Sequence, residues 1–344
     1  MPDKLTFKTS SVTKALLSTL PERARDVIER RYGLVGKGGE GMTLEAIGQI
    51  YGITRERVRQ IENFAVETIR KSDAYSKTKP IFDELEDYLV SHGGLAKEEL
   101  VLNELGKDEL ARNQIAFLLS LGESFVRLKD DDNFHPRFTI NEETADKVHG
   151  ALTKLHKSIS YDEIVAEAEM IERFMVELKE DLKDYVTQDQ ARNWLGLSKD
   201  IASNPLGEWG LSESPNIRTR GIRDYAYLVL RNQGKPLHFT EVASKIEDVF
   251  DRSAHVATTH NELIKDDRFV LVGRGLYALS EWGYANGVVR EVIKNVLKGR
   301  SLSKEDVINE VLKQRQVKEN TIYVNLQNPR YFRKDVKGRY SVVA

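Results

Sequence analysis

The sequence predicts a mainly α-helical protein with small β-hairpins, in which an N-terminal helix-turn-helix is followed by tandem winged-helix modules. Two patterns support this. Two short amphipathic helices flank a glycine between residues 43 and 70, and a unit of three helices and two short strands recurs after residue 80. The expected segments are 12–72 (helix-turn-helix), 73–80 (polar linker), 81–140, 145–217, 221–282 and 286–344 (winged-helix modules).

Composition excludes several classes of protein. The 344 residues include no cysteine, which removes disulfides, thiol catalysis and zinc sites built from thiolates. The N-terminus lacks the apolar core of a signal peptide, and no run of about 18 apolar residues is present. We therefore expect a soluble, cytoplasmic chain with no membrane partner.

The net charge of −2 hides a division along the chain. Residues 1–80 carry 15 basic and 10 acidic side chains, residues 81–217 carry 14 and 29, and residues 218–344 carry 23 and 15. DNA would repel the acidic middle. That middle suits a contact with a basic protein surface or the spacing of two DNA-binding ends, and a merely soluble acidic spacer is an equal alternative.

The first predicted element after the N-terminal helices is a helix-turn-helix. Helical spacing of apolar residues runs from Thr13 to Tyr32, with Pro21 opening a second helix. The glycine-rich stretch 33–41 then predicts a flexible loop. It is not a phosphate loop, because no strand precedes it and no Ser or Thr follows Lys37.

Thr43 is the expected N-cap of a short helix, and Gly52 is expected to end it. Thr54 then caps a second helix, whose apolar side chains recur at spacings of three and four. These apolar positions are Val58, Ile61, Ala65 and Ile69.

The first two turns of this second helix carry polar side chains away from its apolar stripe. They are Arg55, Glu56, Arg59 and Gln60. The N-terminal end of such a helix enters the major groove, where Arg binds guanine, Gln binds adenine and Glu accepts from cytosine. The alternative is a solvated helix face with internal charge pairs.

The segment T-L-E-A-I-G-Q-I-Y-G-I-T-R-E-R-V-R-Q-I-E, Thr43–Glu62, closely resembles region 4 of the housekeeping class of bacterial RNA polymerase sigma factors. The upstream L-P-E-R-A-R-D-V-I-E-R-R-Y-G-L, Leu20–Leu34, is similar to the preceding helices of that family, so the resemblance covers roughly residues 12–72. Two departures are Phe64, where the family usually has Lys, and the long glycine loop.

The resemblance implies recognition of the promoter −35 element in double-stranded DNA and binding to the flap of the polymerase beta subunit. It places Arg55, Glu56 and Gln60 at base edges and Arg59 at a base or a nearby phosphate. It implies contacts to the DNA backbone from another group: Arg31, Thr43, Leu44 and the helper Arg57. No domain for melting the −10 element is recognisable, so we do not expect the chain to open promoters alone.

The third module resembles the HARE-type helix-turn-helix domain, which occurs in the delta subunit of bacterial RNA polymerase and beside some restriction enzymes. Residues 221–282 carry this resemblance, which implies transcription or DNA modification rather than catalysis. In the fourth module, basic side chains are expected on and beside the wing: Arg330, Arg333, Lys334, Lys337 and Arg339. The second module is the faintest, with its hairpin expected around Glu208–Ile217.

No catalytic, cofactor or metal site is expected. The seven histidines are scattered, and the closest pair, His255 and His260, is spaced by five residues without a third ligand. The tryptophans Trp194, Trp209 and Trp282 are expected in cores. The sequence thus predicts a sigma-like, non-enzymatic transcription factor. The alternatives are a polymerase-bound regulator that hardly reads DNA, and an accessory protein of DNA modification or phage defence.

Overall fold

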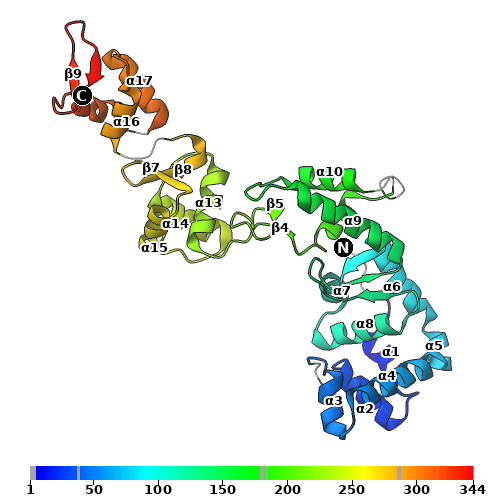
Figure 1. Ribbon diagram of the computed structural model, residues 1–344. Helices are drawn as coiled ribbons and strands as arrows, with labels where there is room; N and C mark the ends of the chain where they lie inside the picture. Colours follow the sequence, from blue (N-terminus) through cyan, green and yellow to red (C-terminus); the bar gives the residue numbers. More distant parts are fainter. Residues whose placement is uncertain are drawn as a thin grey trace. The chain divides into compact units, whose positions relative to one another are not determined.

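The computed structural model describes residues 5–36, 39–178, 182, 185–284, 288–315 and 317–343. It is mainly helical with small antiparallel sheets, which confirms the predicted class (Figure 1). The chain divides into two compact units: Met1–Ala202 with Trp209–Ser212, and Ser203–Glu208 with Glu213–Ala344. None of the helices in the described ranges is long and apolar enough to span a bilayer.

The N-terminal part of the first unit consists of α1 (Thr9–Leu17), α2 (Glu22–Arg31), α3 (Leu44–Tyr51) and α4 (Arg55–Arg70). Both predicted N-caps are confirmed. The Thr43 hydroxyl accepts a hydrogen bond from the Ala46 amide at 3.1 Å, and that of Thr54 accepts from the Arg57 amide at 3.2 Å. A small core of Val27, Ile47 and Val58 then fixes the angle between these helices.

Two glycines shape the turn between α3 and α4. Gly52 ends α3 with a φ of +61°, in the left-handed region that glycine adopts without strain, as predicted. Gly48 lies inside α3 against the turn, where an added Cβ would sit 2.6 Å from the Ile53 carbonyl oxygen. The close approach of the two helices therefore requires glycine at position 48.

After the helix-turn-helix, a similar order of described elements recurs four times: a helix, a short strand or an isolated bridge, further helices and a strand pair. The first repeat follows the short helix α5 (Asp73–Lys77), which lies in the segment expected as a linker. This repeat comprises α6 (Lys79–Ser91), β1 (Leu95–Lys97), α7 (Glu98–Leu105), α8 (Glu109–Leu121), β2 (Val126–Leu128) and β3 (Arg137–Thr139). Its sheet has the order β1-β3-β2, with Phe138 opposite both Ala96 and Arg127.

The second repeat comprises α9 (Glu142–Ser158), α10 (Glu167–Glu177), α12 (Gln188–Leu195), β4 (Ile201–Ser203) and β5 (Trp209–Leu211). A bridge between Val165 and Trp209 stands where the first repeat has β1. Its strand pair begins earlier than expected, because the turn is made within Asn204–Glu208, upstream of Trp209. Trp194 and Trp209 lie in cores, as predicted.

The second unit contains the third repeat, which comprises α13 (Ile222–Gln233), β6 (Leu237–His238), α14 (Phe239–Phe250), α15 (Val256–Lys265), β7 (Phe269–Gly273), β8 (Leu276–Leu279) and the 3₁₀ turn η1 (Ser280–Trp282). It also contains the fourth repeat, which comprises α16 (Val289–Leu297), α17 (Lys304–Gln314), α18 (Glu319–Leu326), β9 (Phe332–Lys334) and β10 (Tyr340–Val342). Gly275 and Gly338 have φ values of +70° and +80°, as the predicted hairpin turns require.

Within the first unit, one apolar cluster runs from the helix-turn-helix into the first repeat. It includes Leu16, Ile28 and Ile69 from the former and Phe117 and Phe138 from the latter. Polar contacts surround this core: the Asn113 side chain donates to the carbonyls of Gly33 and Gly39 at 3.1 and 2.8 Å, and Arg70 Nε donates to the Leu121 carbonyl at 2.9 Å. The helix-turn-helix is therefore built onto the first repeat rather than tethered to it.

The two helical glycines Gly48 and Gly150 give a matched test of this packing. Gly48→Ala should destabilise the α3–α4 pair by about 1 to 3 kcal/mol, because the methyl group overlaps a fixed carbonyl. Gly150→Ala, on α9 with open space around it, should stabilise its helix by about 0.5 to 1 kcal/mol. Hydrogen exchange of peptides from α3, α4 and α9 measures both, and faster exchange of α9 in Gly150→Ala would contradict the assignment.

Candidate nucleic-acid interface

The N-terminal half of α4 presents a polar face to solvent. Val58, Ala65 and Ile69 are fully buried, which fixes the rotation of the helix about its axis. The five polar residues in its first two turns are consequently all exposed: Arg55, Glu56, Arg57, Arg59 and Gln60. The four candidate base readers thus lie on one exposed face, next to the turn that leads from α3.

Four of these five side chains form pairs within the helix. Arg59 donates from Nη2 and Nε to the two carboxylate oxygens of Glu56, at 2.6 and 2.9 Å. These hydrogen bonds lower the pKa of the Glu56 carboxyl, so it is ionised near neutral pH. Arg57 Nη1 donates to Gln60 Oε1 at 2.9 Å. In the described part of the chain, no hydrogen bond or ion pair holds the Arg55 guanidinium.

The residues expected at the DNA backbone surround the start of α3. Arg31 Nη1 donates to the Met42 carbonyl at 2.9 Å, and its Nε lies 3.4 Å from the Glu62 carboxylate on α4. Arg31 therefore ties the end of α2 to the segment before Thr43. The Thr43 hydroxyl is occupied as an N-cap acceptor, and the half-buried Leu44 begins α3, where backbone amides lack helical partners.

The expected wing contacts lie in the second unit. Arg333, Lys334, Lys337 and Arg339 are all exposed, on β9 and in the turn to β10. The turn is folded by Asp335, whose carboxylate accepts from the amides of Lys337 and Arg339 at 2.8 and 2.9 Å. The structure does not place these side chains in one site with α4.

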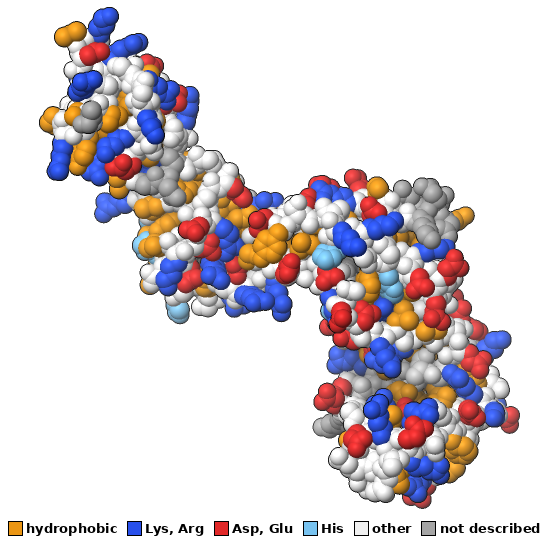
Figure 2. Space-filling model, in the orientation of Figure 1, with side chains coloured by type: hydrophobic (Ala, Val, Ile, Leu, Met, Phe, Trp, Pro, Cys, Tyr) orange, Lys and Arg blue, Asp and Glu red, His pale blue; other side chains and the backbone are white. Residues whose placement is uncertain are grey.

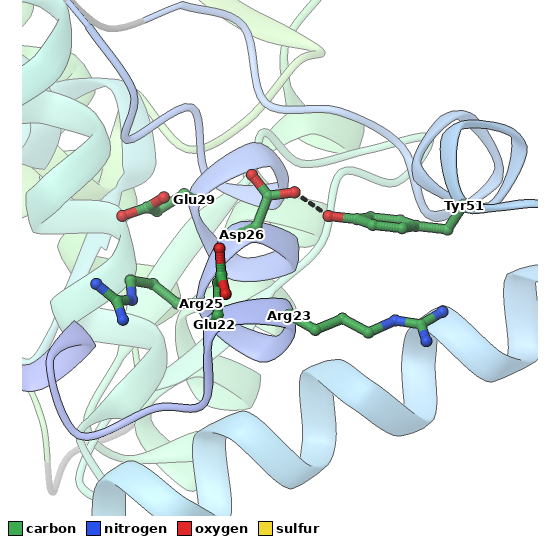
Figure 3. Close-up of a pocket in the computed structure, with 6 residues that line it drawn as sticks. All are labelled: Glu22, Arg23, Arg25, Asp26, Glu29 and Tyr51. Carbon is green, nitrogen blue, oxygen red and sulfur yellow. Dashed lines mark hydrogen bonds between the residues drawn. The ribbon is translucent and has the colours of Figure 1, made fainter.

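A polar pocket of about 610 Å³ lies between α2 and α3, and no pattern in the sequence indicated it. Figure 3 shows the Asp26 carboxylate directed at the Tyr51 hydroxyl, which donates a hydrogen bond to it. Arg30 Nε also donates to Asp26 at 2.8 Å, and the Arg23 guanidinium lies 5.4 Å from the centre of the Tyr51 ring. These contacts join α2 to the last residue of α3 and so help to hold the turn.

The pocket carries mixed charge. Its acidic members Glu22, Asp26 and Glu29 face two arginines, so it offers no net attraction to phosphate. Within the described residues, no group of three or more His, Asp or Glu side chains is placed to hold a metal ion. The exposed face of α4 is therefore the stronger candidate for a functional surface.

Comparison with known proteins finds relatives of the N-terminal part of the chain. The family model of sigma-70, region 4, matches residues 16–71. RNA polymerase sigma factor SigA1 of Synechococcus elongatus is 47% identical over 66 residues, which are 19% of this chain and 16% of the relative. SigA of Microcystis aeruginosa is 48% identical over 64 residues, 19% of this chain and 15% of the relative.

The matched segment thus spans less than one fifth of the length of these curated relatives. It contains the end of α1, all of α2 and α3, and α4 with its exposed polar face. Residues 16–71 of this chain form a sigma-70 region 4 domain.

Proposed function

We propose that this chain is a DNA-binding regulator of transcription initiation, which recognises a promoter −35-like element with α4 and associates with the RNA polymerase core at the beta flap. The observation that carries the proposal is the exposed row of Arg55, Glu56, Arg59 and Gln60 at the start of α4, within a region 4 domain. The proposal describes a binding protein without catalytic residues.

The four candidate base readers differ in the hydrogen bonds that they make before DNA binds. No hydrogen bond from the described residues holds the Arg55 guanidinium, which can therefore donate two hydrogen bonds to a guanine. Gln60 must release Arg57 before its amide pairs with an adenine, and Arg57 then turns to the backbone. Arg59 and Glu56 must separate or act as one unit, because the Arg59 guanidinium donates to the Glu56 carboxylate. Arg55 is therefore the residue whose loss reports base reading most directly.

The start of α3 is proposed to contact the DNA backbone. The free amides of its first turn, next to Thr43 and Leu44, suit a phosphate oxygen. Arg31, whose side chain is partly exposed beside Met42, supplies the positive charge. These contacts set the register of α4 without sequence preference.

We further propose that the four repeats are winged helices and that the third is of the HARE type. Support comes from their shared order of elements and from the sheet orders β1-β3-β2 and β6-β8-β7, in which the last strand lies between the other two. On this view Arg333, Lys334, Lys337 and Arg339 of the fourth repeat contact the DNA backbone.

A second candidate function is a polymerase-bound regulator that acts mainly through protein contacts. Two observations favour it. The internal pairs Glu56–Arg59 and Arg57–Gln60 occupy hydrogen-bonding groups that base reading needs. Residues 81–217 carry 29 acidic and 14 basic side chains, which suits a basic protein surface.

Fluorescence anisotropy of the full chain separates the two candidates. A duplex with a −35 consensus and its scrambled counterpart are titrated across a salt series. We expect a preference for the consensus of about tenfold or more, equal to about 1.4 kcal/mol. Equal affinity for both duplexes would favour the protein-contact candidate, which a pull-down with the isolated beta flap then tests.

Arg55→Ala should weaken binding to the consensus duplex by about 1 to 3 kcal/mol and leave the scrambled duplex much less affected, because a base contact is lost. Lys71→Ala is the matched control: it removes the same charge at the other end of α4, where Lys71 is exposed and pairs with Glu67 at 3.6 Å. Base reading by Arg55 is wrong if its variant weakens both duplexes equally.

A further inference from the structure

The four repeats differ in what covers the third helix of each. These helices are α8, α12, α15 and α18. In a winged helix the third helix is the one that enters the DNA groove, so its exposure decides whether the repeat can bind DNA. The structure separates the four helices on this criterion.

The helix-turn-helix covers α8. After its first residue, Glu109, every residue of α8 is buried or half-buried. The Phe117 ring packs edge-on against Tyr32 with 5.2 Å between ring centres, and Gln114, only 6% exposed, accepts a hydrogen bond from Thr9 at 2.7 Å. These contacts leave too little of α8 exposed for it to lie in a groove of DNA.

The first repeat covers one side of α12, and three polar residues on its other side stay exposed. Trp194, only 1% exposed, donates from Nε1 to the Leu95 carbonyl at 3.1 Å, and Gln190 donates to the Ser91 carbonyl at 3.1 Å. The exposed cation of α12, Arg192, is neutralised by Glu167 and Asp189 at 2.8 and 2.6 Å. In the first and second repeats, the third helix thus packs against the preceding module: α8 against the helix-turn-helix and α12 against the first repeat.

The third repeat leaves α15 exposed but gives it little charge. Its solvent face includes the apolar Val256 and Ile264, and Lys265 lies at its end beside Glu262. Residues 218–284 hold 10 basic and 9 acidic side chains. This surface lacks the excess of positive charge that duplex DNA requires.

The fourth repeat combines an exposed third helix with strong positive charge. Ile322 and Leu326 are buried, while the exposed residues of α18 are Glu319, Asn320, Thr321 and Val324, and Lys318 precedes the helix. Residues 288–344 hold 13 basic and 6 acidic side chains. Figure 2 shows Lys and Arg side chains gathered over this repeat, around the β9–β10 hairpin.

A cluster of cations extends this surface at the start of β9. The guanidinium of Arg290, the ammonium of Lys294 and the guanidinium of Arg330 lie 4.4, 4.9 and 5.8 Å from the centre of the Tyr331 ring. One carboxylate, Glu291, lies near Arg290 and Lys294, at 3.2 and 3.6 Å. The cluster keeps a net positive charge that a backbone phosphate would neutralise.

We propose that the fourth repeat is a second binding site for duplex DNA, in which α18 lies in the major groove while the β9–β10 hairpin and the Tyr331 cation cluster contact backbone phosphates. The first three repeats do not take part. The inference rests on the proposed function in taking duplex DNA as the ligand and the repeats as winged helices, and it does not require that α4 reads a sequence.

The test compares two double variants of the full chain on the scrambled duplex. Lys337→Ala with Arg339→Ala removes two exposed cations of the hairpin. Lys154→Ala with Lys157→Ala removes two exposed cations of α9 in the second repeat. We expect the hairpin variant to bind more weakly and to lower the slope of log K against log salt by about 2, at roughly 0.9 per lost phosphate contact. The α9 variant should bind as the unaltered chain does.

Asn320→Asp tests the placement of α18, because a new carboxylate in the groove should weaken both duplexes several-fold, while circular dichroism confirms the fold. An unchanged salt slope in the hairpin variant, or an equal loss in the α9 variant, would overturn the second site. If base reading by α4 fails instead, the chain shows no preference for the consensus duplex, but the hairpin variant still binds DNA more weakly than the unaltered chain.

Discussion

The burial of α8 beneath the helix-turn-helix is the interaction on which the arrangement of the first unit depends. An isolated domain of about 60 residues buries too little surface to be more than marginally stable. Here the apolar faces of α1, α2 and α4 continue into the core of the first repeat, through Phe117 and its neighbours. Asn113 also fastens the ends of the glycine loop, at Gly33 and Gly39. The exposed end of α4 is thereby presented by a larger body than the helix-turn-helix alone.

This burial limits how the helix-turn-helix can meet another protein. Among its described residues, the large hydrophobic side chains that stay exposed are Val35, Ile50 and Phe64. A partner such as the proposed polymerase flap must use these or the polar surface, because the apolar face of α1 and the second half of α4 is taken. Phe64 places apolar surface on α4 where the core leaves it uncovered.

Local signals in the sequence were sufficient for the helix-turn-helix. Thr43, Thr54 and Gly52 act within three or four residues of themselves, and the apolar spacing of α4 fixes which residues face solvent. Contacts between distant residues were not predictable in this way. From the sequence, Asn113 is expected to be a surface side chain. In the structure it donates to the carbonyls of Gly33 and Gly39, which lie 80 and 74 residues before it in the chain. The bond between Asp26 and Tyr51 likewise depends on the packing of α2 against α3.

The acidic stretch of the chain coincides with the repeats whose third helix packs against the preceding module. In the acidic stretch, residues 81–217, the third helix α8 is covered and α12 packs one side onto the first repeat. Positive charge is in excess in residues 1–80, which contain α4, and in residues 288–344, which contain α18. An acidic body between basic ends also disfavours nonspecific binding along its own length. Its charge therefore favours contacts in which DNA meets the ends of the chain.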